Sequence, residues 1–193
     1  MSLSLILASG SVYRKRLMQQ LQLEFMTCSP NIDELPRVKE TAQAMVLRLA
    51  IEKAQAVAKI YPGHIIISSD QAAVLNNQIM GKPHYFEQAL EQLKRASGNT
   101  VVFYTSLCVL NTASGCQQQA VDEYQVTFRP LTESEIIHYI ERDKPFDCAG
   151  SFKAESLGIL LFESMQGNDY NSLIGLPLIK LTGMLKNEGI SPV

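Results

Sequence analysis

The stretch Leu3-Ser-Leu-Ile-Leu-Ala-Ser-Gly-Ser-Val-Tyr-Arg-Lys-Arg16 decides the fold class. Its first part, residues 3–8, is a short apolar run that ends in small residues, which is typical of a buried strand followed by a tight turn. Residues 13–23 then carry apolar side chains at helical spacing, and Ser11 is a suitable N-cap. A strand that runs through a turn into a helix indicates an α/β protein.

Strands and helices alternate along the rest of the chain. Apolar or β-branched runs predict strands, and apolar residues at helical spacing predict helices. The predicted strands cover residues 25–29, 64–69, 101–110, 121–129 and 157–162, and the predicted helices cover residues 41–60, 86–97, 132–142 and 171–186. Because two of these strands follow one another directly, part of the sheet is expected to be antiparallel. We therefore predict a mixed-sheet α/β fold rather than a doubly wound one.

Composition excludes several classes of function. The chain has 193 residues, and 17 basic against 19 acidic side chains give a net charge of −2, which is unsuited to binding nucleic acid or an anionic membrane. No apolar run reaches the roughly 18 residues of a membrane helix, and residues 1–8 lack the basic start of a signal peptide. The four cysteines form no C-x-x-C pair and show no zinc-finger spacing. We expect one cytoplasmic domain over residues 1–193, without a nucleic-acid or membrane partner.

The turn after the first strand has the composition of an anion site. Free backbone N–H groups and the positive end of a helix dipole favour a bound anion at such a position. Arg14, Lys15 and Arg16 crowd the start of the helix, where acidic residues are usually favoured. Three cations there suit a phosphate ligand; the alternative is a solvated basic turn capped by Ser11.

Two lysines and one aspartate occupy positions that suit phosphate chemistry. Asp70 follows the predicted strand 64–69, and α/β proteins usually bind ligands at the carboxyl ends of strands. Such a carboxylate would hold a metal or deprotonate a water, unless it only starts a turn. Lys53 lies on the apolar face of helix 41–60, either directed into a cleft or extended to solvent. Lys82, in a Gly-Lys-Pro turn, either serves the same site or is solvated.

Two further segments complete the candidate site. The loop 31–39 carries Asp33 and Glu34, whose carboxylates are either exposed or ligands of a hard divalent cation. The segment 149–155 has small residues that allow a ligand to approach the backbone, and it ends in Glu155. Neither a glycine-rich phosphate motif nor a G-x-S-x-G nucleophile is present in the sequence. Metal-assisted attack of water on a phosphate therefore fits these residues best.

These stretches resemble the motifs of the Maf family of nucleoside triphosphate pyrophosphatases along essentially the whole chain. The matching stretches are Leu5-Ile-Leu-Ala-Ser-Gly-Ser11 with Arg14, Asp33-Glu34 with Pro36, Glu52-Lys53-Ala54, Ser69-Asp70-Gln71, Gly81-Lys82-Pro83, Ala149-Gly150-Ser151 and Gly175-Leu176-Pro177. Their common order and spacing make the resemblance specific. It implies a two-lobed α/β fold similar to that of inosine triphosphate pyrophosphatases, with the substrate cleft between the lobes.

The resemblance also implies a role for each matching residue. Asp70 would be the proton acceptor that activates water, and Glu34 and Asp70 would bind a divalent metal cation, Mg²⁺ or Mn²⁺. The triphosphate would be held by the side chains of Ser9, Ser11, Arg14, Lys53 and Lys82. Water would attack at the α–β phosphate linkage and release pyrophosphate, in a protein that forms a homodimer.

Within the family, the chain looks most like the branch that hydrolyses 7-methyl-GTP, through Tyr13, Gln71 and Glu155. N7-methylation makes guanine a cation, which favours stacking on an aromatic ring and pairing with a carboxylate. The resemblance thus implies that these three residues set base specificity. One alternative is the dTTP/UTP branch, which carries Gln where this chain has Glu155. Another is a non-catalytic, nucleotide-binding regulator of cell division.

Overall fold

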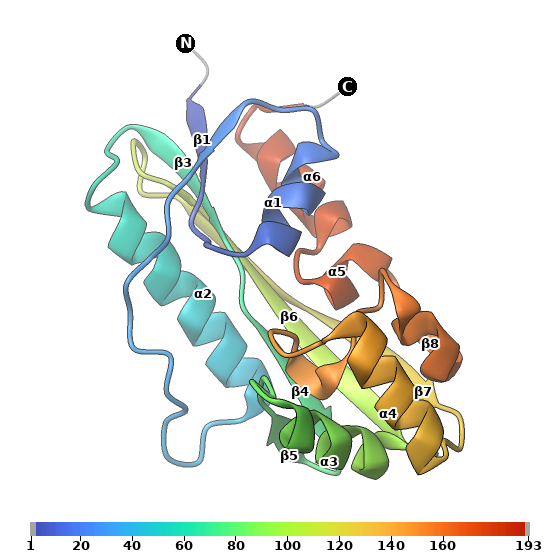
Figure 1. The fold of residues 1–193 in the computed structure, drawn as a ribbon. Coiled ribbons are helices and arrows are strands. Elements are labelled where there is room, and N and C mark those ends of the chain that lie inside the picture. The colour runs from blue at the N-terminus through green and yellow to red at the C-terminus, as the bar shows by residue number, and fades with distance from the viewer. Residues whose placement is uncertain (1–2, 192–193) are drawn as a thin grey trace.

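Two long antiparallel strands, β6 (Thr100–Asn111) and β7 (Gln117–Phe128), run through the centre of the computed structural model (Figure 1). The structure describes residues 3–191, so the first two residues of the segment 1–8, in which the sequence predicts no signal peptide, lie outside the described residues. The other strands are β1 (Ser4–Leu7), β2 (Phe25–Thr27), β3 (His64–Ser68), β4 (Gln71–Leu75), β5 (Gln78–Met80) and β8 (Phe162–Gly167). Within residues 3–191 these eight strands form one sheet.

The sheet is mixed, as the sequence predicts. The strand order is β2-β1-β3-β6-β4-β5, and β7 joins the other edge of β6 to β8. β1 is parallel to β2 and β3, whereas the pairings among β3 to β8 are antiparallel. The expected antiparallel part is therefore the β6–β7 pair and its neighbours.

β6 changes partner halfway along its length. Residues 108–111 pair with β3, and residues 102–105 pair with β4. Because β3 and β4 are consecutive in the chain, they form one interrupted strand along β6, with its gap at Ser69 and Asp70. Ser106 closes part of the gap, since its N–H donates to the carbonyl oxygen of Asp70 at 2.9 Å. The interruption leaves Asp70 between the two halves of the sheet.

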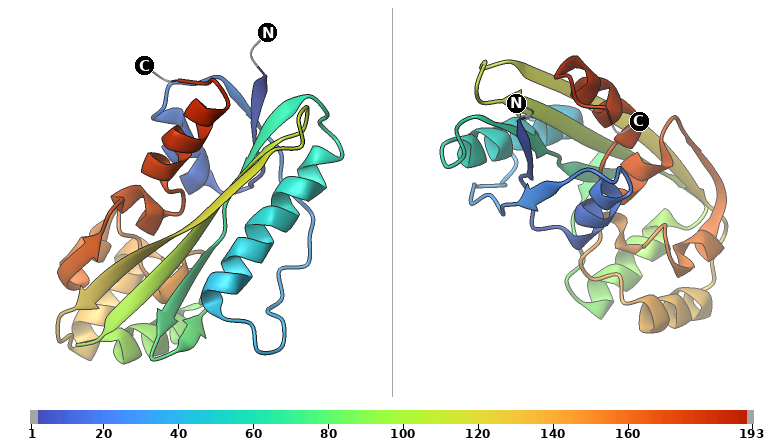
Figure 2. Two further views of the ribbon diagram at one scale, coloured as in Figure 1. Left: turned by 180° about the vertical axis from the view of Figure 1, so that it is seen from behind. Right: turned by 90° about the horizontal axis from the view of Figure 1, so that it is seen from above.

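Helices cover the sheet differently at its two ends. They are α1 (Val12–Gln19), α2 (Ala42–Ala58), α3 (Phe86–Ala96), α4 (Glu133–Asp143), α5 (Tyr170–Ile174) and α6 (Leu178–Asn187). At the end that holds β1 and β3, α2 packs on one face and α1 with α6 on the other (Figure 2). At the end that holds β4 and β5, α3 and α4 pack against the sheet. No helix within residues 3–191 has the length and apolar content to cross a membrane.

The buried side chains divide into two lobes along the sheet. One core centres on Phe103, Phe128 and Phe152, between the sheet and the helices α3 and α4. The other is built on β1 and β3, whose residues alternate between the α2 face and the α1–α6 face. The two-lobed mixed α/β architecture expected from the sequence is present.

The predicted strand 157–162 is wrong in its first five residues. Leu157–Leu161 form a 3₁₀ helix, and the strand there is β8, Phe162–Gly167. The N–H groups of Ser156 and Gly158 both donate to the carbonyl oxygen of Lys153, which coils the chain. A short apolar run does not by itself distinguish a strand from a helix.

Two other elements differ from the prediction. The β4–β5 hairpin was not predicted; its turn, Asn76-Asn77, has both residues at positive φ, which asparagine tolerates. The predicted helix 171–186 is two helices, α5 and α6, because the chain turns at Gly175 with φ of 129° and continues through Pro177.

Candidate active site

A cavity of about 500 Å³ lies between the two lobes. Its walls come from the β1–α1 turn, the middle of α2, the β3–β4 gap and the segment that follows α4. All ten site residues selected from the sequence line it, namely Ser9, Ser11, Tyr13, Arg14, Glu34, Lys53, Asp70, Gln71, Lys82 and Glu155. The topology thus brings together residues that are up to 146 positions apart in the sequence, from Ser9 to Glu155.

The β1–α1 turn is held by its own serines. Ser11 is the N-cap of α1, and its Oγ accepts a hydrogen bond from the N–H of Arg14 at 3.3 Å. Ser9, which is buried, accepts from the N–H of Ser11 at 3.1 Å. No acidic residue occupies the first turn of α1, so the positive end of its dipole faces the cavity without an internal counterion.

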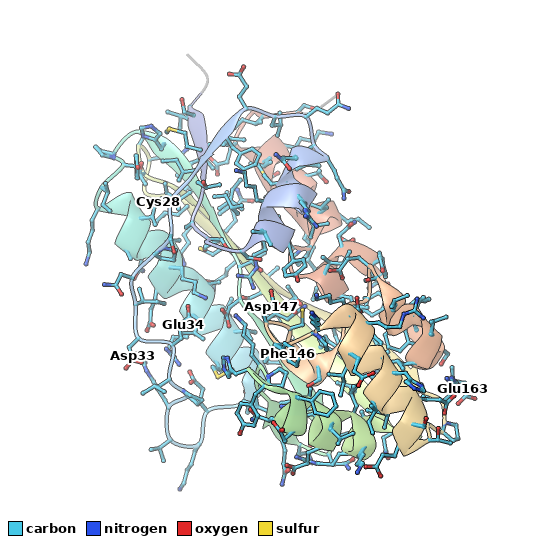
Figure 3. All side chains as sticks on the ribbon, viewed as in Figure 1. Cys28, Asp33, Glu34, Phe146, Asp147 and Glu163 are labelled. Carbon is cyan, nitrogen blue, oxygen red and sulfur yellow. The ribbon has the colours of Figure 1, made fainter. Side chains whose placement is uncertain are left out.

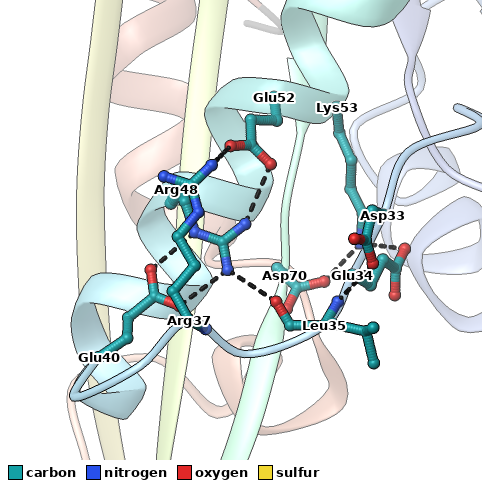
Figure 4. A network of polar contacts seen from close by, with 9 residues as sticks. All are labelled: Asp33, Glu34, Leu35, Arg37, Glu40, Arg48, Glu52, Lys53 and Asp70. Carbon is teal, nitrogen blue, oxygen red and sulfur yellow. Dashed lines mark hydrogen bonds and ion pairs between the residues drawn. The ribbon is translucent and has the colours of Figure 1, made fainter.

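Lys53 connects the two carboxylates expected to bind metal. Its side chain is only 6% exposed, and its ammonium lies 2.9 Å from Glu34 Oε1 and forms a second ion pair with Asp70 Oδ1 (Figure 4). It therefore points into the cleft rather than reaching solvent, which decides between the two alternatives left by the sequence. Burial makes the pairing necessary, because an isolated ammonium would be costly in this environment.

The backbone of Asp70 is fixed by β6. Its N–H donates to Ser106 Oγ at 3.0 Å, and the same hydroxyl donates to the carbonyl oxygen of Val46 in α2 at 2.6 Å. The preceding residue, Ser69, donates through Oγ to the carbonyl oxygen of Gly175 at 2.9 Å. A buried carboxylate held in this way presents Oδ1 to Lys53 and the cavity.

Arg14 reaches the same carbonyl group of Gly175. Its Nε donates to that oxygen at 2.8 Å, which anchors the guanidinium beside the β3–β4 gap. Burial lowers the pKa of Arg14, while the charges of Asp70 and Glu34 act in the opposite direction. The Gly175 carbonyl thus accepts from both Arg14 and Ser69, and the left-handed φ of Gly175 explains why glycine suits this position.

The loop that carries Glu34 is fastened to α2 by Arg48 (Figure 4). The Arg48 guanidinium donates to Glu40 Oε1 at 2.6 Å and Oε2 at 2.8 Å, and to the carbonyl oxygen of Leu35 at 3.2 Å. It also pairs with Glu52 at 3.0 Å. These bonds hold both ends of the segment 35–40 against the helix that presents Lys53.

Four other cavity residues differ in what they contact: Tyr13 and Gln71 form hydrogen bonds, whereas Glu155 and Lys82 are exposed. The Tyr13 hydroxyl donates to the carboxylate of Asp147, at 3.2 Å from Oδ2. Gln71 Nε2 donates to Thr105 Oγ1 and to carbonyl oxygens of α5, all at 2.9 Å, so this amide group holds α5 in place. Glu155 and Lys82 are exposed on the cavity wall, and within residues 3–191 neither forms an ion pair.

Comparison with known proteins shows which family and fold this chain shares. The model of the family described as Maf-like protein matches residues 4–188. The chain belongs to the Maf-like protein family. Its fold is shared with the Ham1 protein of Staphylococcus aureus, with a TM-score of 0.56 and 14% identity over 96% of this chain and 99% of that one. This match confirms the predicted α/β fold.

Three relatives of this Maf-like chain carry the name 7-methyl-GTP pyrophosphatase. The protein of Pseudomonas savastanoi pv. phaseolicola is 54% identical, covering 97% of this chain and 98% of the relative. The protein of Pseudomonas aeruginosa is 52% identical, with 96% and 97% covered, and that of Nitrosococcus oceani is 50% identical, with 96% and 94% covered. The similarity therefore extends over nearly the whole of each protein.

Three residues of this Maf-like chain take part in the site although the sequence analysis gave them no role. Ser106 is hidden within a buried strand, where its polarity beside Thr105 is the available sign. Gly175 was noted only as part of a matching stretch. Asp147 lies in an ordinary polar loop and gains its place through the contact with Tyr13.

The donor set fits a divalent cation that arrives with a triphosphate. Within the part of the chain that the structure describes, no group of three His, Cys, Asp or Glu side chains surrounds a common point. Asp70 and Glu34 nevertheless share one ammonium and line one cavity. Mg²⁺ is commonly bound by one or two carboxylates together with substrate phosphates, so two carboxylates suffice.

Proposed function

We propose that this chain is a nucleoside triphosphate pyrophosphatase that hydrolyses 7-methyl-GTP to 7-methyl-GMP and pyrophosphate. The names of three relatives at 50–54% identity support the activity and the substrate. The observation that carries the proposal is the convergence of Asp70, Lys53 and Arg14 in one cavity with Tyr13 and Glu155. Cations, a carboxylate base and an aromatic ring are the groups that a cationic nucleotide triphosphate requires.

Asp70 would accept the proton of the attacking water. The water oxygen forms a new bond to phosphorus, the anhydride bond between the α and β phosphates breaks, and pyrophosphate leaves. Asp70 is suited to this role because its main chain is fixed at the strand gap while Oδ1 faces the cavity. A buried, oriented carboxylate avoids the reorganisation that a solvated one would need.

The cations of the site would hold the triphosphate. Arg14, the N-terminus of α1 and Lys82 supply positive charge along the cavity, and Ser9 and Ser11 supply small polar groups. A divalent cation such as Mg²⁺ or Mn²⁺, held by Glu34 and Asp70, would neutralise negative charge that develops on the phosphates. Lys53 would then exchange an ion pair with these carboxylates for one with a phosphate oxygen.

The base would be selected by charge. Tyr13 would stack on the methylated guanine, and Glu155 would pair with its positive charge and ring N–H groups. Gln71 would act through its carbonyl oxygen Oε1, because Nε2 already bonds to Thr105 and α5. The family resemblance and the composition support two further parts of the proposal, a homodimer and a cytoplasmic location.

Pyrophosphate release from 7-methyl-GTP, GTP, dTTP, UTP and CTP tests the proposal, with Mg²⁺ or Mn²⁺ present. We expect preference for 7-methyl-GTP, and a loss of about 10²-fold or more in kcat for Asp70→Asn. Asp33→Asn is the matched control, because Asp33 lies outside the cavity lining and asparagine keeps an acceptor for the N–H of Leu35.

The outcomes separate the alternatives. Preference for dTTP or UTP would keep the pyrophosphatase activity and contradict the branch assignment. Glu155→Gln is then the variant to compare, since the dTTP/UTP branch carries glutamine there. No release from any nucleotide by folded, metal-supplied protein would favour the non-catalytic binder. Equal activity of Asp70→Asn and the wild type would remove Asp70 from the reaction.

A further inference from the structure

The cavity holds carboxylates in two electrostatic settings. Asp70 and Glu34 both pair with the ammonium of Lys53. Asp147 and Glu155 also line the cavity, but within residues 3–191 no lysine or arginine forms an ion pair with either. Within residues 3–191, the part of the cavity wall that holds these two residues therefore carries carboxylates that are not ion-paired.

Asp147 joins the two lobes at this place. It lies between α4 and the 3₁₀ turn Ala149–Ser151, facing the start of α1 (Figure 3). Its carboxylate accepts from the Tyr13 hydroxyl at 3.2 Å and 3.4 Å, and lies 3.4 Å from Cys148 Sγ. The ring of Tyr13, in the first lobe, is thus oriented by a carboxylate from the second lobe.

The pKa values of Cys148 and Tyr13 are both raised in part by the carboxylates nearby. Burial raises the pKa of the Cys148 thiol to about 12, and the charges of Asp147 and Glu155 both add to the increase. Burial also raises the pKa of Tyr13, again with a contribution from Asp147. Asp147 and Glu155 therefore both lie close enough to Cys148 to raise the pKa of its thiol, and all three residues line the cavity.

We propose that Asp147 is a specificity-determining residue that selects a cationic nucleobase over a neutral one. Its carboxylate supplies negative charge beside the ring of Tyr13 and fixes that ring for stacking. A carboxylate and an aromatic face together favour a methylated, positively charged purine over neutral guanine. This inference rests on the proposed function, because it names the residue that discriminates 7-methyl-GTP from GTP.

The test compares 7-methyl-GTP with GTP in three variants. Asp147→Asn keeps an acceptor for the Tyr13 hydroxyl and removes the charge, and Asp147→Ala removes both. Glu163→Gln is the matched control, because it removes one negative charge from an exposed position on β8, far from the cavity (Figure 3). The first readout is kcat/KM for 7-methyl-GTP divided by kcat/KM for GTP. The second is the equilibrium dissociation constant of GMP divided by that of 7-methyl-GMP, so that both ratios are larger when the methylated base is preferred.

We expect Asp147→Asn to lower both ratios about threefold to fivefold, because Asp147 is partly exposed and solvent screens its charge. The kcat/KM for GTP and the dissociation constant of GMP should stay unchanged within about twofold. Asp147→Ala should lower them further, and Glu163→Gln should leave them unchanged. Unchanged ratios in Asp147→Asn, or an equal loss for both nucleotides, would overturn the proposal. The ratio of dissociation constants can be measured without turnover. If the wild type binds the nucleotides but releases no pyrophosphate, the proposed function is contradicted, and the effect of Asp147 on base selection can still be measured by binding. No binding preference in the wild type would overturn the inference itself.

Discussion

Replacing Ser106 by alanine is expected to destabilise the protein and disturb its site together. Ser106 is fully buried in β6, and its Oγ accepts from the N–H of Asp70 and donates to the carbonyl oxygen of Val46. Alanine removes both bonds. Val46 keeps its intrahelical hydrogen bond in α2, but the N–H of Asp70 is left without its acceptor in a buried position.

The expected loss is about 1.5–4.5 kcal/mol of unfolding free energy. An orphaned buried donor costs about 1–3 kcal/mol, and the neutral bond to Val46 adds about 0.5–1.5 kcal/mol. For a chain of this size each kcal/mol corresponds to about 2–4 °C in Tm, so the midpoint should fall by about 3–18 °C. The freed peptide also moves Asp70, so kcat should fall about tenfold.

Ser68→Ala provides the matched control. Ser68 is equally buried, and its Oγ donates to the carbonyl oxygen of Ala50, one helical turn along α2 from Val46. It does not hold the N–H of Asp70, so its replacement should cost about 1 kcal/mol and leave kcat unchanged. Urea denaturation and pyrophosphate release measure both effects. Equal losses of stability and kcat in the two variants would refute the reasoning.

Three further predictions follow from the contacts. Burial raises the pKa of the Cys108 thiol from 9.0 to about 11. As pH rises, the unfolded chain therefore loses the thiol proton before the folded chain does. Between pH 9 and 11 the free energy of unfolding should fall by up to about 1.4 kcal/mol per pH unit. Urea denaturation at a series of pH values measures this fall, which should be smaller in Cys108→Ala. Arg48→Lys should raise the Mn²⁺ concentration for half-maximal activity several-fold at unchanged maximal kcat, because lysine cannot hold both Leu35 and Glu40. At pH 8, iodoacetamide should label exposed Cys116 at least tenfold faster than Cys148, whose raised pKa leaves little thiolate; mass spectrometry of the peptides measures this.

Local chemistry made part of the site predictable. The capped turn before α1 follows from Ser11, which acts within a few residues of the chain. Of the three cations expected to suit a phosphate there, only Arg14 lines the cavity, and Lys15 and Arg16 are exposed outside it. The β-branched run before Asp70 correctly predicted that Asp70 follows the carboxyl end of a strand. These features depend on neighbours in the sequence, which is why they appear before any tertiary contact is known.

Contacts between distant elements could not be predicted in the same way. The sequence left Lys53 either in a cleft or at the surface, and only the packing of α2 against the β3–β4 gap pairs it with Asp70. Gln71 matched a specificity position, yet its amide Nε2 holds α5, across 101 positions of sequence. The strand predicted over 157–162 failed for a different reason, since its apolar run lacks a period that separates strand from helix.

The polar residues at the centre of the sheet hold the backbone at the end of the cavity where we propose that phosphate binds. Ser69, Asp70, Thr105 and Ser106 are all buried between the two apolar cores. Their hydrogen bonds reach α2, α5 and Gly175, so each polar group is satisfied by a different element. Such a belt is tolerated only when it is fully bonded, and it then fixes the backbone that carries Asp70.

The end of the cavity where we propose that the base binds is built differently, and this difference predicts independent effects. Tyr13 and Asp147 meet at a partly exposed contact outside the polar belt. A change at Asp147 should alter the ratio between 7-methyl-GTP and GTP, whereas Ser106→Ala should lower kcat for both nucleotides equally. Since the two sites share no bonding partner, the double variant should show the two changes added in free energy, within about 0.5 kcal/mol. A larger deviation would mean that the two ends of the cavity are coupled through the sheet, and that base selection also depends on the strand gap.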